Sequence, residues 1–348
     1  MRIAVLVGGS SPERDVSLAS GKGIVQALLE RGHEACPVDP ALSIGAQCGP
    51  GDARIGECPP VGIPALEPDQ VFEWVRSPLI RNADVVFNGL HGGAGEDGTI
   101  QAILESAGIP YTGTGVLGSA LAMNKDRSKA LFREAGVAVA PHILITGFRA
   151  GGSGALLERV AAGPGFPAVV KPNNQGSSVG FSYLPGEEGL DEALARAASF
   201  GDDVIVERFV RGQEITAAIL DGEPLPLVEI VPEGGFYDYK RKYTKGTSRY
   251  VVPAELDEGL SVRIQEQAVS AYRALACRDY ARVDFRLSET GEPSCLEVNT
   301  LPGMTELSLV PMAARSAGIG FGELVERISA MALARRGAAG AGESTRPE

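Results

Sequence analysis

Apolar residues follow two alternating patterns along the first third of the chain. Residues 3–7 form a continuous apolar run, which is typical of a buried strand, and residues 24–29 then carry apolar side chains at helical spacing until Gly32. The same order is repeated by an apolar strand at 85–87 and a helical pattern that ends at Gly108. Strands that alternate with helices predict a parallel α/β sheet.

The rest of the chain predicts two further units and a tail. The middle contains a predicted helix at 127–135 and a strand that ends at Lys171, and the C-terminal part contains a long helix at 260–276. The glycine- and proline-rich segment 41–68 predicts a surface loop. We therefore expect a Rossmann-like parallel-sheet unit at 1–122, two α+β units at 123–211 and 212–334, and a disordered tail at 335–348.

Length, charge and cysteine content narrow the class of protein. A chain of 348 residues is longer than the chains that usually fold around a single hydrophobic core, which favours two or three domains. The formal net charge of −12 argues against duplex DNA or an anionic membrane as the main partner. The chain shows no signal-peptide pattern and no apolar run near the ~18 residues of a membrane span, and its five cysteines form no C-x-x-C pair. We expect a cytoplasmic protein that binds neither nucleic acid nor membrane.

Two segments near the C-terminus alternate between apolar and polar residues. Segments 282–287 and 295–299 have the period of strands in a half-buried sheet, and the connection over 288–293 is short enough for a hairpin. The alternation in the second segment predicts that Leu296 and Val298 lie together on the core face.

The polar face of this hairpin carries candidate metal ligands. If the apolar faces meet the core, Asp284, Glu297 and Asn299 converge on one surface, and two carboxylates with an amide oxygen are hard ligands suited to Mg²⁺. Arg282 shares that face, where it could neutralise a developing negative charge. Alternation alone fits a merely hydrated sheet face equally well, so the metal interpretation depends on phosphate-binding residues elsewhere.

A lysine followed by a glycine- and serine-rich loop supplies such residues. Lys171 ends a predicted strand, and the segment 172–180 includes Ser177 and Ser178 between glycines that allow several N–H groups to face one anion. The lysine precedes the glycines, so this is not a Walker A loop. Lys125 is a second candidate cation, although a hydrated lysine at a helix start would look the same.

Two carboxylates flank a segment that could hold a nucleoside. Glu207 and Glu214 bracket a predicted strand edge, where a carboxylate could bind ribose hydroxyls. A strand and turn with exposed charges fits these residues equally well.

In order and in sequence, these motifs resemble the ATP-grasp superfamily and, within it, the D-alanine–D-alanine ligase family. The resemblance covers about residues 1–330. Its matching strings are residues 8–17 (GGSSPERDVS), 91–98 (HGGAGEDG), 111–115 (YTGTG), 123–125 (MNK), 171–180 (KPNNQGSSVG), 236–243 (FYDYKRKY), 282–284 (RVD) and 297–304 (EVNTLPGM).

The resemblance implies a three-domain ATP-grasp fold and a set of ligand roles. ATP and two Mg²⁺ or Mn²⁺ ions are expected in the site, with Glu297 bridging the ions. The expected metal ligands are Asp284, Glu297 and Asn299. The expected ATP-binding residues are Lys125, Lys171, Ser177, Ser178, Glu207, Phe209, Val210 and Glu214.

The resemblance also implies where two D-alanine molecules bind. Glu13 is expected to hold the ammonium of the first D-alanine, with His91 beside it. Tyr243 is expected to hydrogen-bond with Ser177 and Glu13 from a mobile loop, whose Lys242-Tyr243 pair is similar to that of dipeptide-forming relatives. Expected further contacts to the second amino acid or to the tetrahedral oxyanion come from Lys242, Arg282, Gly303, Ser308 and Leu309.

The implied reaction is ATP-dependent formation of D-alanyl-D-alanine through D-alanyl phosphate, for peptidoglycan precursor synthesis, in a homodimer. An ATP-grasp ligase of other small amino acids or D-hydroxy acids is the alternative within the superfamily. A Rossmann-type oxidoreductase is disfavoured because the first strand is not followed by G-x-G-x-x-G with an acidic residue ~20 positions on. A non-catalytic nucleotide-binding module would need neither Arg282 nor Tyr243.

Overall fold

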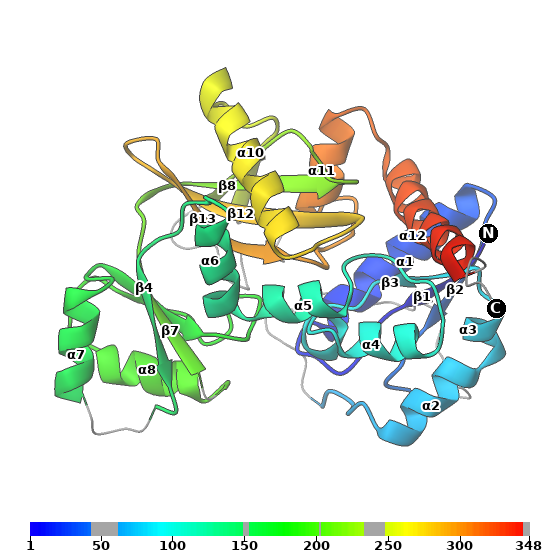
Figure 1. Ribbon diagram of the computed structural model, residues 1–348, viewed down its shortest axis with the longest axis horizontal. Helices are drawn as coiled ribbons and strands as arrows, with labels where there is room; N and C mark the ends of the chain where they lie inside the picture. The colour runs from blue at the N-terminus through cyan, green and yellow to red at the C-terminus, as the bar shows by residue number, and fades with distance from the viewer. Residues whose placement is uncertain (43–61, 149–152, 202, 233–247, 344–348) are drawn as a thin grey trace.

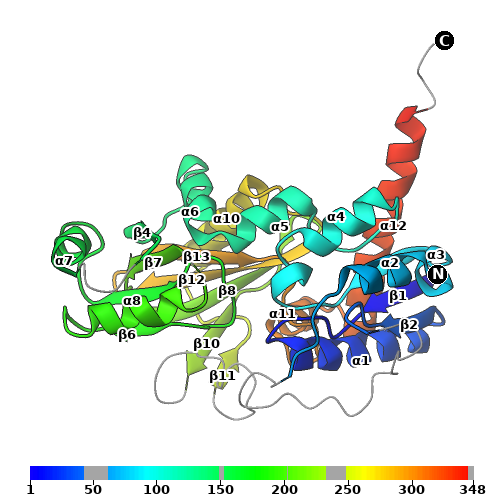
Figure 2. The same cartoon turned by 90° about the horizontal axis from the view of Figure 1, so that it is seen from below.

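The computed structural model describes residues 1–42, 62–148, 153–201, 203–232 and 248–343. Three sheets follow one another along the chain, and Figure 1 shows their elements as three neighbouring groups, with α5 and α6 between them. Figure 2 shows the long C-terminal helix projecting from the N-terminal group. Within the described part of the chain, no helix is both long and apolar enough to cross a lipid bilayer.

A three-stranded parallel sheet with the order β2-β1-β3 lies in the N-terminal part. Its elements are β1 (Arg2–Leu6), α1 (Arg14–Glu30), β2 (Glu34–Val38), α2 (Pro68–Arg76), α3 (Pro78–Arg81), β3 (Val85–Asn88), η2 (Gly93–Gly95), α4 (Thr99–Ser106) and α5 (Val116–Met123). Ile3 and Val5 pack on the side of α1, whereas Ala4 and Leu6 pack on the side of α2, α3 and α4. Helices thus cover both faces, which explains the continuous apolar run of the first strand.

A four-stranded antiparallel sheet with the order β4-β7-β5-β6 forms the middle part. Its elements are α6 (Lys125–Glu134), β4 (His142–Thr146), α7 (Ser153–Ala162), β5 (Ala168–Pro172), β6 (Ser182–Leu184), α8 (Leu190–Ala198) and β7 (Asp203–Arg208). Val170 and Val206 belong to the hydrophobic core under α7 and α8. Alternation therefore points their neighbours Lys171 and Glu207 to the opposite face, toward the third sheet.

The third sheet is antiparallel and has the order β11-β10-β8-β12-β13, with a short strand β9 beside β8. Its elements are β8 (Gly212–Leu220), β9 (Glu223–Pro224), β10 (Val228–Pro232), β11 (Ser248–Val251), α10 (Glu258–Ala274), β12 (Tyr280–Ser288), β13 (Pro293–Asn299), α11 (Leu309–Ser316) and α12 (Phe321–Glu343). One face packs under α10 through residues such as Val283 and Phe285. The other face is polar at Arg282 and Asp284, and becomes apolar at Tyr280.

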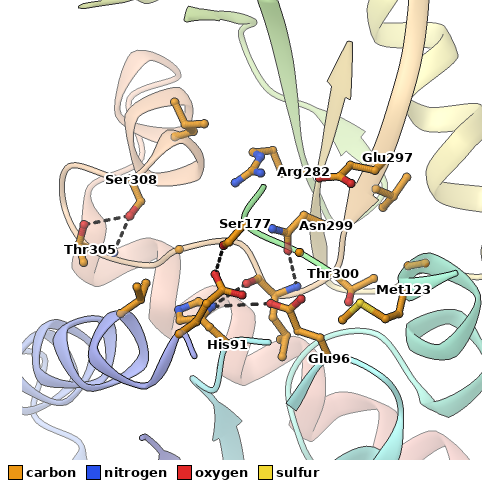
Figure 3. Close-up of a pocket in the computed structure, with 18 of the residues that line it drawn as sticks. His91, Glu96, Met123, Ser177, Arg282, Glu297, Asn299, Thr300, Thr305 and Ser308 are labelled. Atoms are coloured by element: carbon orange, nitrogen blue, oxygen red, sulfur yellow. Dashed lines mark hydrogen bonds and ion pairs between the residues drawn. The ribbon is translucent and has the colours of Figure 1, made fainter. Parts of the chain in front are cut away.

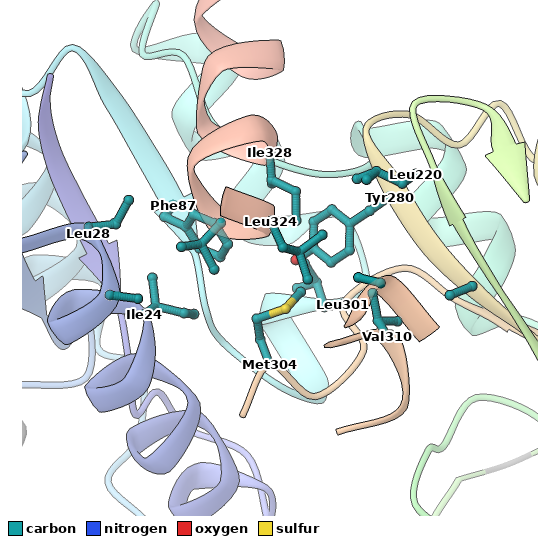
Figure 4. Packing of buried hydrophobic residues seen from close by; sticks show 14 of the residues in the cluster. Ile24, Leu28, Phe87, Leu220, Tyr280, Leu301, Met304, Val310, Leu324 and Ile328 are labelled. Carbon is teal, nitrogen blue, oxygen red and sulfur yellow. The ribbon is translucent and has the colours of Figure 1, made fainter. Parts of the chain in front are cut away.

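One hydrophobic core joins the parallel sheet to the third sheet. Figure 4 shows Ile24 and Phe87 from the N-terminal part on one side and Tyr280 and Val310 on the other, with Leu324 of α12 between them. All five side chains are buried. This shared core fixes the loop after β13 against the N-terminal part, where residues of both line a large cavity.

The C-terminal end differs from the sequence prediction. The segment 335–348 is predicted as a disordered tail because it lacks an apolar face, yet α12 continues to Glu343. Arg335 forms an ion pair with the buried carboxylate of Asp279 and donates to the carbonyl of Tyr111 at 2.8 Å. The polar contacts of Arg335 hold the end of α12 against the protein, and the alanines that follow have a high helix propensity. Together they favour a helix in this segment although it lacks an amphipathic pattern. Residues 344–348 and most of the predicted 41–68 loop lie outside the described residues.

Candidate active site

Two cavities meet at four residues in the centre of the molecule. The larger, of about 390 Å³, lies between the N-terminal part and the third sheet, and Figure 3 shows His91, Ser177, Arg282 and Ser308 around it. The smaller, of about 140 Å³, lies between the second and third sheets. The residues that line both cavities are Lys125, Gly176, Ser177 and Glu297. A ligand in one cavity can therefore meet a ligand in the other at this junction.

The far end of the smaller cavity is apolar and aromatic. Phe209 packs edge-to-face on Tyr183 with ring centroids 4.9 Å apart, and the guanidinium of Arg286 lies 5.4 Å from the centroid of the same ring. Arg286 Nε also donates to the carbonyl of Val210 at 3.1 Å and lies near Glu214, with 3.5 Å between its guanidinium and the carboxylate. These contacts build a partly apolar wall with an aromatic ring, which suits a planar ligand group.

Leu296 contradicts its predicted orientation. The sequence pattern places it on the core face with Val298, but the structure places it in the wall of the smaller cavity. The cause is a β-bulge, because Asp284 pairs with Glu297 whereas the next residue, Phe285, pairs with Cys295. Cys295 and Val298 are buried in the core, so Leu296 and Glu297 both face the cavity.

Three charged side chains form a buried chain at the floor of the smaller cavity. The carboxylate of Glu207 contacts Lys129 Nζ at 2.6 Å with one oxygen and Lys171 Nζ at 2.9 Å with the other. Burial acts to raise the pKa of Glu207, but the two ammonium groups outweigh it and the pKa is lowered. Burial lowers the pKa of Lys129. For Lys171, burial acts in the same direction, but the carboxylates of Glu207 and Glu297 outweigh it and its pKa is raised.

The junction itself joins a lysine, a carboxylate and the serine loop. Lys125 Nζ lies 3.0 Å from a carboxylate oxygen of Glu297 and donates to the Gln175 carbonyl at 2.7 Å. Ser177 and Ser178 have φ of 49° and 58°, in the left-handed region that non-glycine residues seldom adopt. Ser177 Oγ donates a short hydrogen bond to Glu13. Consecutive left-handed residues turn their N–H groups toward one side, as anion-binding loops do.

The polar face of the β12–β13 hairpin carries the expected metal ligands. Asp284 and Glu297 are direct cross-strand partners, and Asn299 pairs with Arg282 in the same ladder. The described residues contain no group of three His, Cys, Asp or Glu side chains arranged for a metal, so any site here consists of two carboxylates and an amide. This oxygen-only donor set, beside two lysines and the serine loop, fits Mg²⁺ or Mn²⁺ bound together with nucleotide phosphates.

The larger cavity contains a buried histidine network. His91 Nδ1 lies 2.9 Å from the Leu301 carbonyl, which can only accept, so Nδ1 carries the proton and Nε2 accepts from Ser20 Oγ at 3.1 Å. Ser20 Oγ in turn accepts from the Met304 N–H at 3.3 Å. Burial lowers the pKa of His91, which favours the neutral ring. The network fastens residues 301–304, including the Gly303 N–H, to α1.

Glu96 is an unexpected carboxyl group in this cavity. It lies 3.9 Å from His91 Nδ1, and burial raises its pKa to about 8, with the nearby Glu13 carboxylate adding to the effect. Figure 3 shows Glu96 below Asn299 and Thr300. The raised pKa favours the protonated, uncharged form of Glu96, which limits the negative charge near Glu13 and Glu297.

The opposite wall is the start of α11. Ser308 is the N-cap residue and Leu309 the first helical residue, so the first turn presents N–H groups that have no partner within the helix. The Ser308 hydroxyl accepts from the Thr305 N–H at 3.0 Å and a Cβ at Gly303 would lie 3.1 Å from it. A helix N-terminus of this kind suits a carboxylate.

The structure therefore brings most of the predicted site residues to one place. The eight predicted ATP-binding residues all line the smaller cavity, and Glu13, His91, Arg282, Gly303, Ser308 and Leu309 line the larger one. Lys242 and Tyr243 lie outside the described residues. Four residues with evident roles in the geometry were not predicted: Lys129, Glu96, Arg286, and Thr216, whose hydroxyl donates to the Asp284 carboxylate. Of these, Lys129 had a usable signal, since it follows Lys125 by one helical turn.

Comparisons with known proteins agree with this geometry. The family profile described as D-ala D-ala ligase N-terminus matches residues 2–114, and the one described as D-ala D-ala ligase C-terminus matches residues 131–330. The chain belongs to the D-alanine–D-alanine ligase family. This ligase is 45% identical over 328 residues to the D-alanine–D-alanine ligase of Geobacter sulfurreducens, covering 94% of this chain and 92% of that one. It is 40% identical to that of Halalkalibacterium halodurans, covering 96% and 99%.

Solved structures give the same result for the fold. The D-alanine–D-alanine ligase of Bacillus anthracis superposes with a TM-score of 0.77 at 32% identity, covering 97% of this chain and 99% of that one. A second structure of that enzyme, described as complexed with ATP, has the same TM-score at 31% identity. The predicted ATP-grasp fold and ligase activity are thus confirmed: the chain is an ATP-dependent ligase that forms D-alanyl-D-alanine for peptidoglycan precursor synthesis, with a divalent metal.

Proposed function

We propose that this ligase works in two steps at the junction of its cavities, with D-alanyl phosphate passing between them. The observation that carries the proposal is that Lys125, Gly176, Ser177 and Glu297 line both cavities. A γ-phosphate in the smaller cavity and an amino acid carboxylate in the larger one would meet there. Holding the two reactants side by side at this junction would favour the transfer between them.

In the first step, a carboxylate oxygen of D-alanine attacks the γ-phosphorus of ATP, a new P–O bond forms, and the bond to ADP breaks. Glu13 holds the ammonium of this D-alanine, and its hydrogen bond from Ser177 couples that position to the phosphate loop. Lys125, Lys171 and the N–H groups around Ser178 offset charge on the transferring group. We assign adenine contacts to Phe209 and Val210.

Glu207 and Glu214, which both line the smaller cavity, have different proposed roles in nucleotide binding. Glu207 gives its two oxygens to Lys129 and Lys171, which suits it to placing a lysine rather than to binding ribose hydroxyls. Glu214 is the better candidate for the ribose, since it lies in the cavity wall beside Arg286.

Asp284, Glu297 and Asn299 are the proposed ligands of two Mg²⁺ or Mn²⁺ ions, with Glu297 shared between them. When bound, the ions would offset phosphate charge and help to orient the γ-phosphoryl group. Because Lys125 contacts Glu297 directly, the lysine would also hold this ligand in place before nucleotide arrives.

In the second step, the amine of the second D-alanine attacks the acyl carbon and phosphate leaves. The start of α11 at Ser308 and Leu309 is placed to bind the carboxylate of this amino acid. Arg282 and the Gly303 N–H are placed to stabilise the tetrahedral oxyanion. The roles expected for Lys242 and Tyr243, the boundaries at 122 and 211, the homodimer and the cytoplasmic location stay predictions.

A substrate panel tests the proposal. Phosphate release from ATP is measured with D-alanine, L-alanine, D-serine and D-lactate, and hydroxylamine is added to trap an acyl phosphate as a hydroxamate. We expect release with D-alanine far above that with L-alanine, and a D-alanyl hydroxamate that depends on ATP. Equal turnover of L-alanine or D-lactate would instead support a ligase of other small acids, and the absence of hydroxamate would argue against the intermediate.

A further inference from the structure

Lys129 is a fully buried lysine that does not line either cavity. Its side chain is 0% exposed, and its Nζ donates to Glu207 at 2.6 Å and to the Cys295 carbonyl at 3.3 Å. The second oxygen of Glu207 contacts Lys171, whose side chain is 15% exposed and faces the smaller cavity. From the core to the cavity, the charged groups therefore follow in the order Lys129 ammonium, Glu207 carboxylate and Lys171 ammonium.

The charges of Lys129, Glu207 and Lys171 together affect how strongly the cavity attracts a polyphosphate. Glu207 and Lys171 alone would form a neutral pair, and the carboxylate would compete with phosphates for the ammonium. With Lys129 on its other oxygen, the trio has a net charge of +1, and the excess lies at the cavity side on Lys171. In a partly buried site, such a difference of one charge acts strongly on an anion.

Lys129 also spans the two walls of the cavity. Glu207 lies on β7 of the second sheet, whereas Cys295 lies on β13 of the third sheet, directly before Leu296 and Glu297. One ammonium group therefore fixes the position of Lys171 on one wall relative to the bulged strand that presents Glu297 on the other.

Stability alone gives little reason for a lysine at this position. The neighbouring Phe132 and Cys295 are buried in the apolar core of the third sheet. Burial of an ion pair costs desolvation that an apolar side chain would avoid, so such pairs are often neutral or unfavourable for folding. A role in placing charge explains the arrangement better than a role in stability.

We propose that Lys129 is a positioning residue for ATP: it occupies Glu207, leaves the charge of Lys171 available to the phosphates, and sets the spacing of the cavity walls through Cys295. This inference rests on the proposed role of Lys171 in phosphate binding. Lys129 acts through Lys171 and does not itself contact the nucleotide.

The test measures binding of ATP and of adenosine by calorimetry in the full-length ligase with Mg²⁺ and without D-alanine. Lys129→Met should weaken ATP binding about 10- to 100-fold, the range expected for a lost charged hydrogen bond, and change adenosine binding less than about threefold. Lys22→Met, which removes an exposed lysine from α1, is the matched control and should change neither. Lys129→Met/Glu207→Gln, which restores the net charge of +1, should recover most of the ATP affinity.

A double-mutant cycle with Lys171→Met distinguishes a failure of the role proposed for Lys129 from a failure of the phosphate contact proposed for Lys171. If Lys129 acts through Lys171, the double variant should bind ATP no more weakly than Lys171→Met alone. Additive losses, equal losses for ATP and adenosine, or unchanged ATP affinity in Lys129→Met would overturn the role of Lys129. Unchanged affinity in Lys171→Met would instead overturn the proposed phosphate contact. If Lys129→Met does not fold, Lys129→Gln, which keeps a donor but removes the charge, replaces it with the same expected outcomes.

Discussion

Arg282 holds Asp284 with two parallel hydrogen bonds, from Nε to Oδ1 and from one terminal nitrogen to Oδ2, each 2.8 Å long. Oδ1 also accepts from Thr216 Oγ1 at 2.6 Å. Bidentate contacts of this type fix the plane of the guanidinium. The residue proposed for the oxyanion and a residue proposed for the metal are thus one unit, and each sets the charge and orientation of the other.

This coupling predicts opposite effects on turnover and metal affinity. Arg282→Met should reduce kcat about 10²- to 10³-fold, as loss of an oxyanion donor does. It should also bind Mn²⁺ at least as tightly as the unchanged ligase, because a cation next to Asp284 has been removed. Phosphate release gives the first value, and electron paramagnetic resonance of Mn²⁺ with ADP gives the second. Unchanged turnover would remove Arg282 from the mechanism.

Glu297→Gln should abolish the Mg²⁺ dependence of ATP binding. The carboxylate is the residue expected to be shared by the ions, and its loss also leaves Lys125 without its partner at 3.0 Å. Glu292→Gln removes a charge from the exposed turn of the same hairpin and is the matched control. Calorimetric titration of ATP with and without Mg²⁺ measures the effect, and retained Mg²⁺ dependence in Glu297→Gln would argue against the ligand assignment.

Glu13→Gln should raise the KM for the first D-alanine by about 10- to 100-fold with little change in ATP affinity, because an ammonium loses a charged partner. Ser177→Ala keeps the carboxylate but loses the hydrogen bond to it, so its effect on the same KM should be smaller. Steady-state kinetics at saturating ATP provide both values. A larger effect of Ser177→Ala than of Glu13→Gln would reverse the proposed roles.

The partly buried carboxyl group of Glu96 predicts a pH dependence of stability. Its pKa is raised from 4.5 to about 8 in the folded chain, so between these values the folded state keeps a proton that the unfolded state has released. Its contribution therefore destabilises the fold increasingly as pH rises from about 4.5 to about 8. Glu96→Gln removes this contribution and should be more stable than the unchanged ligase at pH 9, with the difference vanishing toward pH 4.5. Urea unfolding of the nucleotide-free proteins across this range checks the sign.

Much of the site follows from local sequence patterns. Alternation alone places Asp284, Glu297 and Asn299 on one strand face, and the glycines around Ser177 indicate an anion-binding loop. The ordered motifs then identify the family. These features can be predicted because they depend only on residues a few positions apart. The geometry of a strand or a loop fixes how such residues are arranged.

The remaining features depend on the register of distant strands. The contact of Lys129 with Glu207 joins residues 78 positions apart, and no periodicity relates a helix to a strand of another unit. The bulge at Asp284 and Phe285 changes the face of Leu296 without any glycine to mark it. Similarly, α12 extends past Ala334 because Arg335 reaches Asp279, which a composition argument does not detect.

The bulge can be tested with two substitutions two residues apart on β13. Leu296→Ala should weaken ATP binding about tenfold, because a Leu side chain buried by the nucleotide contributes about 1.5–3 kcal/mol, and should change the free energy of unfolding little. Val298→Ala, at a core position that is 3% exposed, should instead lower the free energy of unfolding by on the order of 2 kcal/mol and leave ATP affinity nearly unchanged. Calorimetry and urea unfolding separate the two effects. A regular strand without the bulge would make both residues core positions, so equal destabilisation with unchanged ATP affinity in both variants would contradict the observed register.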